Sequence, residues 1–310
     1  RSRRPGKAPP PRSAYEPSSR TTESPLSQDI VNQALRAGID YYQGLQDDDG
    51  HWPGDYGGPM FLMPGLIIAL YVTNKLDHVL SEPHKVEIRR YLRNHQNEDG
   101  GFGLHIEGHS TMFGTVLCYV AMRLLGISPD TSSPVDNDSS MVDALSWIRA
   151  RGGAVSVPSW GKFYLCVLGV YEWDGLNPVP PECWLLPYTL NPLHPGRFWC
   201  HCRMVYLPMS YLYGTRATAQ PTEITEHLRK ELYIDDYECI DWIKTRNWCA
   251  EEDLYYPHPW IQDLIWSGLS KVQQVIVKTS PGTWLRGIAC KLAMEHIHYE
   301  DENTRYIDIG

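Results

Sequence analysis

The sequence predicts an all-α fold in which pairs of helices stack as repeated hairpins. The first observation is an internal repeat, in which three turn residues recur with a spacing of fifty positions: Gln46, Gly50 and Trp52 return as Gln96, Gly100 and Phe102. Self-similarity at such a period is typical of stacked supersecondary units. The second observation is that apolar residues beside each turn follow helical spacing, and no segment has the alternation of a convincing strand.

The first helix is predicted to run from about Ser27 to the turn at residues 47–50. One apolar face of it is spaced at i, i+3, i+4, i+7 and i+11: Val31, Ala34, Leu35, Gly38 and Tyr42. Residues 1–28 are rich in Pro, Ser and Arg, so we expect a disordered basic tail there. A single domain over residues 29–310 is expected to follow.

The next three helices are predicted at residues 58–74, 82–95 and 110–125. Ser110 is the predicted N-cap of the last of these, and Gly126 is its predicted stop. Together with the two turns, these helices complete two copies of the unit helix, glycine turn, apolar helix.

A less regular third copy is predicted over residues 140–171, which keep a glycine pair and Trp160 but lack the glutamine. Six prolines exclude a regular helix over residues 178–195. Beyond that segment the apolar spacing predicts further helices at residues 198–213, 223–248, 260–277 and 281–297.

The glutamine turns have a structural interpretation. Glycine lets the chain leave a helix through positive φ. The glutamine amide offers two donors and one acceptor to free backbone groups at helix ends, and the indole can stack on that amide. We therefore interpret Gln46, Gly50 and Trp52, and their counterparts Gln96, Gly100 and Phe102, as structural residues that tie the outer helices of a barrel together.

Composition limits the function classes. The chain has 28 Lys and Arg against 37 Asp and Glu, a net charge of −9, which argues against nucleic acid as the main partner. Eight cysteines include no CxxC pair, which favours thiols in a reducing compartment. Asp47–Asp49 are interpreted as a solvated turn and Cys200–Cys202 as too close together for a zinc site, so no metal is predicted.

Several blocks then agree, in order and spacing, with one known family. They are DGHWPGDYGGPMFLMPG at residues 49–65, the glycine-rich block at 99–126, GGAVSVPSWGKFYL at 152–165, FWCHCRMVYLPMSY at 198–211 and DLYYPHPW at 253–260. From about residue 30 onward the chain resembles the oxidosqualene cyclases, the lanosterol synthase family in particular. The resemblance implies an α/α-barrel, here the N-terminal barrel of such an enzyme.

The resemblance also implies a chemistry. These enzymes are isomerases that fold 2,3-oxidosqualene in a dry cavity, protonate its epoxide and guide a carbocation through successive ring closures. They use no redox cofactor and no metal. A desolvated cation over a Trp or Tyr face gains roughly 2 kcal/mol or more, and excluding water prevents early quenching. The high content of 11 Trp and 19 Tyr suits such a cavity.

By position, the resemblance assigns five residues to the substrate cavity: Tyr56, Phe61, Trp160, Trp199 and His201. It assigns Cys202 and Tyr206 to the constriction through which substrate enters. The competing interpretation is that all of these are packed core residues. The Trp-containing proline-rich loop at residues 178–195 could dip into one leaflet of a membrane, or pack against another domain. A monotopic protein on the cytosolic face of the endoplasmic reticulum or a lipid droplet is implied.

One departure from the family affects activity. The Asp-Cys-Thr-Ala-Glu string that carries the family's epoxide-protonating aspartate is absent from the sequence. We therefore expect that this chain lacks the domain with the general acid and is inactive alone. Alternatives are a cyclase with another product, such as a protostane, a non-enzymatic lipid-binding remnant, and the prenyltransferase β-subunit class. No feature of the sequence indicates an oligomeric state.

Overall fold

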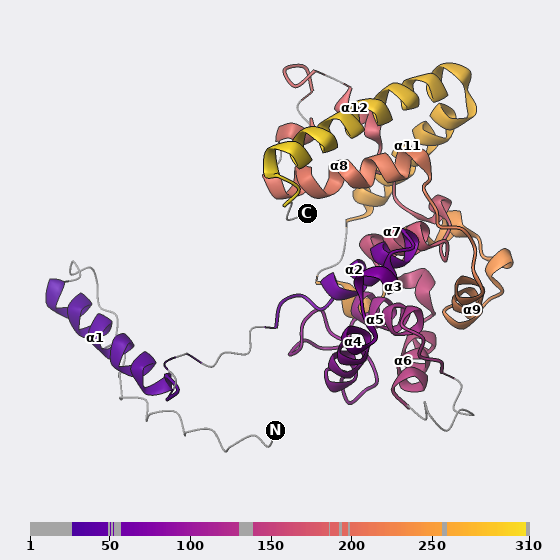
Figure 1. The fold of residues 1–310 in the computed structure, drawn as a ribbon. Coiled ribbons are helices and arrows are strands. Elements are labelled where there is room, and N and C mark those ends of the chain that lie inside the picture. Colours follow the sequence, from indigo (N-terminus) through magenta and orange to yellow (C-terminus); the bar gives the residue numbers. More distant parts are fainter. Residues whose placement is uncertain are drawn as a thin grey trace. The chain divides into compact units, whose positions relative to one another are not determined.

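The computed structural model describes residues 27–48, 50, 52, 57–129, 139–185, 187–191, 194–197, 199–255 and 259–307. The chain divides into two compact units, residues 1–57 and residues 58–310 (Figure 1). Over the described residues the regular elements are α- and 3-10 helices, with one isolated β-bridge between Phe102 and Thr111. The predicted all-α fold is therefore confirmed. The predicted tail at residues 1–28 lies almost wholly outside the described residues, and the domain boundary at residue 29 stays a prediction.

In the first unit, α1 (Gln28–Leu45) begins where the sequence predicts. The Ser27 hydroxyl accepts a hydrogen bond from the Ile30 amide at 3.3 Å, which satisfies one of the amides that a helix start leaves free. The helix ends at Gln46, whose extended backbone leads into the first glycine turn.

The second unit holds the remaining elements. Its α-helices are α2 (Leu62–Val72), α3 (Leu76–Val79), α4 (Glu82–Asn94), α5 (Met112–Leu124), α6 (Ser139–Ala150), α7 (Ser159–Leu168), α8 (Cys200–Thr215), α9 (Glu223–Glu231), α10 (Trp242–Thr245), α11 (Trp260–Lys278) and α12 (Ser280–Thr304). Its 3-10 turns are η1 (Ala154–Ser156), η2 (Trp173–Gly175), η3 (Pro181–Trp184), η4 (Pro195–Arg197), η5 (Tyr237–Cys239) and η6 (Glu251–Asp253). The proline-rich loop accordingly has no described α-helix.

The core of the second unit is organised around α5. All of its residues are buried, and it packs against α2, α4, α6, α7 and α9 (Figure 1). A helix that is apolar on every side can be stable only when it is surrounded in this way. Gly114 permits one of these approaches, because a Cβ there would lie 2.5 Å from the Phe102 carbonyl oxygen.

The predicted N-cap of α5 is wrong by one residue. The N-cap is Thr111, whose hydroxyl accepts a hydrogen bond from the Gly114 amide at 3.0 Å. Ser110 instead donates to Asp99 Oδ1 at 2.6 Å and accepts from Asn97 Nδ2 at 2.9 Å. Both residues are of the type that caps helices. Ser110 does not cap α5 because its hydroxyl is bonded to Asp99, eleven positions away, and Thr111 takes the N-cap position instead.

The single helix predicted over residues 223–248 is also wrong. The chain forms α9, then η5 and then α10. Tyr233, Tyr237 and Trp242 from this stretch gather around Tyr171, with ring centroids between 4.5 and 6.5 Å apart. On a continuous helix Tyr233 and Tyr237 would share one face, but Trp242, nine positions after Tyr233, would lie on the opposite side. Aromatic packing therefore overrides the helical spacing here.

A second group of helices consists of α8, α11 and α12. The long α12 packs against α8, α11 and η3 (Figure 1). Arg286 of α12 is buried and forms an ion pair with Glu182 of η3 and a hydrogen bond with Gln273 of α11. This buried polar cluster therefore fixes the proline-rich loop to the helices.

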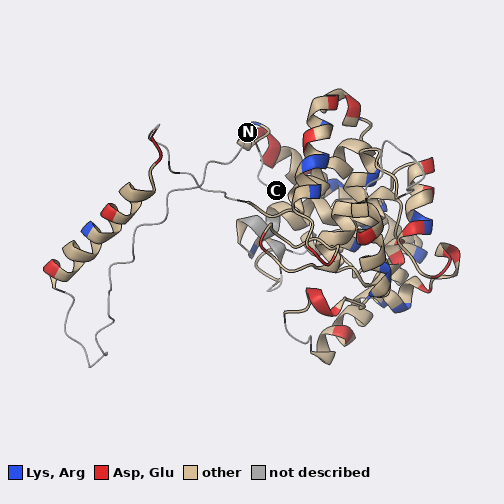
Figure 2. Cartoon of the chain, turned by 90° about the horizontal axis from the view of Figure 1, so that it is seen from below, with Lys and Arg blue, Asp and Glu red and all other residues tan. Residues whose placement is uncertain are grey.

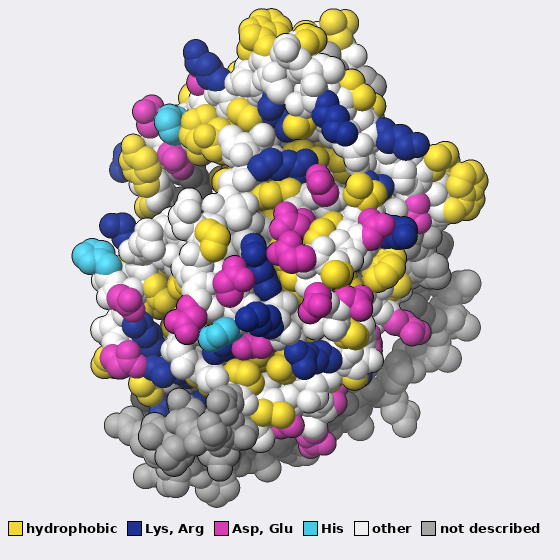
Figure 3. All heavy atoms as spheres, turned by 90° about the vertical axis from the view of Figure 1, so that its right-hand side faces the viewer, with side chains coloured by type: hydrophobic (Ala, Val, Ile, Leu, Met, Phe, Trp, Pro, Cys, Tyr) yellow, Lys and Arg dark blue, Asp and Glu magenta, His cyan; other side chains and the backbone are white. Residues whose placement is uncertain are grey.

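Acidic and basic residues are mixed over the second unit, with an excess of acidic ones. Figure 2 shows acidic and basic residues interspersed along its helices. On the face drawn in Figure 3, charged side chains of both signs lie between hydrophobic ones. Among the described residues, no helix combines the length and the apolar character needed to cross a bilayer.

A buried ion pair between α5 and α9 gives a first prediction. Arg123 bonds both carboxylate oxygens of Glu231 at 2.9 Å, and the Tyr119 hydroxyl donates to the same group at 2.8 Å. Glu231→Gln should lower the free energy of unfolding by about 2–3 kcal/mol, because Arg123 stays buried without its charged partner. Glu226→Gln, the control, removes an exposed pair with Arg229 and should cost under about 0.5 kcal/mol. Denaturant unfolding measures both, and equal effects would contradict the prediction.

Candidate functional site

The two glutamine turns close with the same hydrogen bond. Gln46 Nε2 donates to the Gly50 carbonyl at 2.5 Å, and Gln96 Nε2 donates to the Gly100 carbonyl at 2.7 Å. Both glycines adopt positive φ, 90° and 87°, which a residue with a side chain rarely adopts. The repeat found in the sequence therefore corresponds to one turn geometry that occurs twice.

The aromatic residues of the two turns make different contacts. Trp52 Nε1 donates to the Tyr42 carbonyl at 2.7 Å and so links its turn to the end of α1. Phe102 is fully buried and has no ring donor. At its turn Trp147 of α6 supplies an indole instead, donating to Asp99 Oδ2 at 2.9 Å. Gln96 also donates to the Ser140 carbonyl at 2.8 Å, so the second turn is fixed to α6.

Four aromatic side chains lie in contact in the second unit, and we call them the aromatic file: Phe113, Phe61, Trp160 and Tyr206. Ring centroids of successive members lie 5.4, 6.5 and 6.2 Å apart. The last two contacts are edge-to-face, which is a favoured geometry for aromatic pairs. Trp160 Nε1 also donates to the Tyr206 hydroxyl at 3.4 Å. The structure thus brings together three of the residues that the sequence assigns to the site.

The file is built from the starts of helices. Phe61 directly precedes α2, while Phe113 and Trp160 are the second residues of α5 and α7. Phe113 is buried, Phe61 and Trp160 are half-buried, and Tyr206 on α8 is exposed. The file therefore runs from the core to the surface. Sequence reasoning missed Phe113, because nothing in its spacing separates it from the other core positions of α5.

The other assigned residues are only partly placed. Trp199 is the N-cap of α8 and is 67% exposed. His201 and Cys202 lie in the first turn of α8, but their side chains are outside the described part. Tyr56 lies outside the described residues altogether. The roles assigned to these four residues, like those assigned to Phe61, Trp160 and Tyr206, therefore stay predictions.

A buried lysine lies next to the file, two positions after Trp160. Lys162 is 1% exposed, and its Nζ donates to the carbonyls of Thr245, Arg246 and Trp248 at 2.7, 2.9 and 2.9 Å. Three donated bonds require the ammonium form, because a neutral amine has only two N–H groups. Burial opposes that charge and lowers the pKa of Lys162 to about 7.

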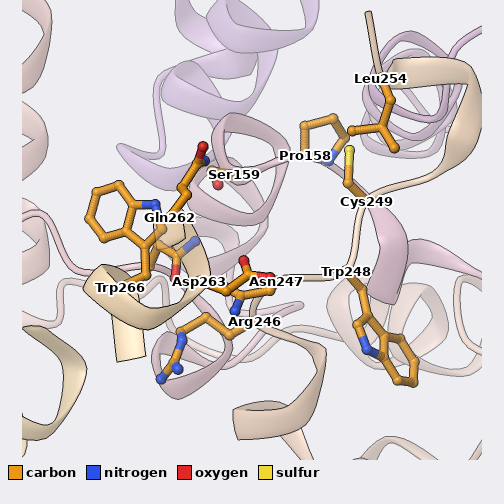
Figure 4. A pocket seen from close by; sticks show the side chains of 11 residues that line it. Pro158, Ser159, Arg246, Asn247, Trp248, Cys249, Leu254, Gln262, Asp263 and Trp266 are labelled. Carbon is orange, nitrogen blue, oxygen red and sulfur yellow. The ribbon is translucent and has the colours of Figure 1, made fainter. Parts of the chain in front are cut away.

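A small cavity of about 170 Å³ opens beside the start of α7 (Figure 4). Its walls come from Pro158 and Ser159, from residues 246–249 and from the first turns of α11, including Asp263 and Trp266. Pockets for drug-sized ligands usually measure about 300–1,000 Å³. This cavity is smaller, and none of the site residues predicted from the sequence lines it. Among the described residues, no group of three or more His, Cys, Asp or Glu is placed to hold a metal ion.

These features define a class: an all-α protein with two glutamine turns of the same geometry, a fully buried helix, and a file of rings at the helix starts of the second unit. Residues 35–306 match the family model of the squalene-hopene cyclase N-terminal domain. The chain therefore belongs to this triterpene cyclase family, whose N-terminal domain is an α/α-barrel. The resemblance inferred from the sequence is confirmed.

Relatives with known names agree with this assignment. The chain is 50% identical over 279 residues to the cycloartenol synthase of Dictyostelium discoideum, covering 90% of this chain and 37% of that protein. It is 51% identical over 282 residues to the alpha-onocerin synthase LCD of Lycopodium clavatum (91% and 36%) and 46% identical over 290 residues to mouse lanosterol synthase (Mus musculus; 93% and 37%). The chain spans little more than a third of these relatives' length.

Lys162 gives a prediction for the pH dependence of stability. Its folded pKa of about 7 lies below the value of about 10.4 for an unfolded lysine, so above pH 7 the unfolded chain binds more protons. The unfolding free energy should therefore rise with pH, by about 2 kcal/mol between pH 7 and pH 9. Lys162→Met should remove this rise, whereas Lys244→Met, at an exposed position, should keep it. Denaturant midpoints at several pH values measure the difference. If stability changes with pH in the same way in wild type and Lys162→Met, the lowered pKa of Lys162 is refuted.

Proposed function

We propose that this chain contributes one wall of the cavity of an oxidosqualene-type triterpene cyclase. In that cavity (S)-2,3-oxidosqualene would cyclise through a carbocation cascade, an intramolecular isomerisation in sterol or triterpenoid synthesis. The observation that carries the proposal is the aromatic file, in which Phe61 and Trp160 are half-buried and hold fixed orientations to Tyr206. Names of the relatives, cycloartenol synthase and lanosterol synthase, support the same chemistry.

The file suits a cationic intermediate. The ring faces carry negative electrostatic potential, and each desolvated contact with a cation contributes roughly 2 kcal/mol or more. The hydrogen bond from Trp160 to Tyr206 satisfies the polar edge of the indole within the wall. The rings are therefore oriented before the substrate arrives, and little reorganisation is needed as charge develops.

We further infer that the 310 residues alone bind this substrate without turning it over. Opening the epoxide requires a general acid, and the Asp-Cys-Thr-Ala-Glu string is absent from the sequence. No residue of the aromatic file can replace it, because a neutral phenol or indole is a very weak acid. The wall would therefore guide a cation that another part of the enzyme generates.

We also propose contact with a membrane surface through the proline-rich loop at residues 178–195. Tyr188 and Leu190 on this loop are 52% and 77% exposed. A Tyr beside an exposed aliphatic residue suits the interface of one leaflet, from which a C30 lipid would enter. This location agrees with a monotopic protein on the endoplasmic reticulum or a lipid droplet.

Ligand binding tests the proposed role of the file. The purified chain should bind a tertiary-amine analogue of squalene, which is cationic at pH 7, more tightly than squalene itself. Trp160→Leu should weaken binding of the cationic analogue by about tenfold more than that of squalene, because only the cation loses a π-face contact. Trp160→Phe should retain most of the preference. Trp284→Leu, at an exposed position on α12, is the control, and an equal loss for both ligands in Trp160→Leu would count against the proposal.

Turnover tests the inferred inactivity separately. Incubating the 310-residue chain with 2,3-oxidosqualene should give no cyclised product by mass spectrometry, because the sequence lacks the Asp-Cys-Thr-Ala-Glu string that carries the family's general acid. A full-length lanosterol synthase serves as the positive control for the assay. Formation of a tetracyclic product by the chain alone would overturn this part of the proposal.

A further inference from the structure

We infer that residues 245–253, which we call the strap, hold the aromatic file at its working spacing, and that Lys162 and Asp253 are the positioning residues. The strap joins α10 to the segment before α11. It lies far from the file in sequence, and none of its side chains belongs to the file. The inference rests on the proposed function, because positioning matters only if the file meets a ligand.

The first anchor connects the strap to α5. Asp253 Oδ1 accepts a hydrogen bond from the Met112 amide at 2.6 Å, and Oδ2 accepts one from the Phe113 amide at 2.9 Å. The first amides of a helix have no partner within the helix, and a carboxylate at that end is favoured by the helix dipole. Asp253 therefore caps α5 from 140 residues away, and it does so on the backbone of a member of the file.

The second anchor connects the strap to α7. Lys162 donates to three strap carbonyls, as described above, and lies two positions after Trp160 on the same helix. Between them is Gly161, where a Cβ would lie 3.1 Å from the Phe113 ring and 2.3 Å from Val157 Cγ2. The starts of α5 and α7 thus touch at Gly161, and the strap is bonded to both of them.

Further bonds hold the middle of the strap. The Ala250 amide donates to the Ser156 carbonyl at 2.8 Å. Glu252 forms an ion pair with Arg151, which directly follows α6, and its carbonyl is bonded to His109 Nε2 at 3.2 Å. A loop that only connects two helices would not need these hydrogen bonds and this ion pair. The strap instead sets the distance between the helix starts that carry Phe113 and Trp160.

The spacing of these rings matters for chemistry more than for stability. A displacement of about 1 Å at a distance from the reacting atoms can cost a hundredfold in rate. The attraction between a cation and a ring also falls when the cation no longer lies over the ring face. A loosened strap should therefore reduce the preference for a cationic ligand over a neutral one, whereas simple destabilisation would weaken both equally.

The experiment combines a structural and a binding measurement on the full chain. The protein is labelled with 5-fluorotryptophan, and the Trp160 fluorine signal is assigned by its absence in Trp160→Phe. Asp253→Asn should shift this signal and lower the ratio of affinities for the squalene amine analogue and squalene by about tenfold. Asp77→Asn is the control, because Asp77 is an exposed carboxylate that pairs with Lys85 of α4 and lies outside both the strap and the file.

The outcomes separate this inference from the proposed function. If the wild type prefers the cationic ligand and Asp253→Asn changes neither the Trp160 signal nor the ratio, the strap inference is overturned and the proposed function stands. If the wild type shows no such preference, the proposed function fails, while the fluorine shift still supports or refutes coupling of the strap to Trp160. If Asp253→Asn does not fold, Glu252→Gln replaces it, because this variant removes only the ion pair with Arg151. It should shift the Trp160 fluorine signal in the same direction by a smaller amount.

Discussion

The complete burial of α5 is the constraint on which the rest of the second unit depends. Because no side of this helix faces solvent, every polar group on it needs a partner from a neighbouring element. The Thr115 hydroxyl donates to the Thr111 carbonyl, and Arg123 reaches both Glu231 and the Ile127 carbonyl. The amides at its start are satisfied by Thr111 and by a carboxylate from far along the chain. The elements that supply these partners are therefore fixed in place around α5.

This arrangement explains why the aromatic file lies at helix starts. Close packing brings the first turns of α5 and α7 together at Gly161, and the residues that follow each cap are directed into the same region. Tyr206 then extends the file along α8 to the surface. Rings at the first turn of a helix are held by cap and backbone bonds as well as by packing, so their orientation is fixed more firmly than that of rings on a loop.

The sequence predicts local features well and long-range ones poorly. The glutamine turns were predictable because Gln46 and Gly50, and likewise Gln96 and Gly100, are partners within four residues. The start of α1 follows an equally local signal, the cap from Ser27. Asp253, Lys162 and Glu231 could not be assigned roles from the sequence, since each bonds to backbone or side chains between 83 and 141 positions away. The break in the predicted helix over residues 223–248 has the same origin, a cluster of rings around Tyr171.

The position of Asp253 also bears on electrostatics. Helix starts carry a partial positive charge, which would disfavour a carbocation held beside Phe113 and Trp160. The carboxylate of Asp253 offsets this charge at α5, because both of its oxygens accept amide bonds of the first turn. The Lys162 ammonium is likewise surrounded by three carbonyl oxygens. These oxygens reduce the positive potential that the ammonium produces at the file. The positive potential of the α5 start and that of Lys162 are therefore both reduced beside Phe113 and Trp160. An aromatic wall built on helix starts therefore favours a cation more strongly when contacts of this kind offset the positive charge behind it.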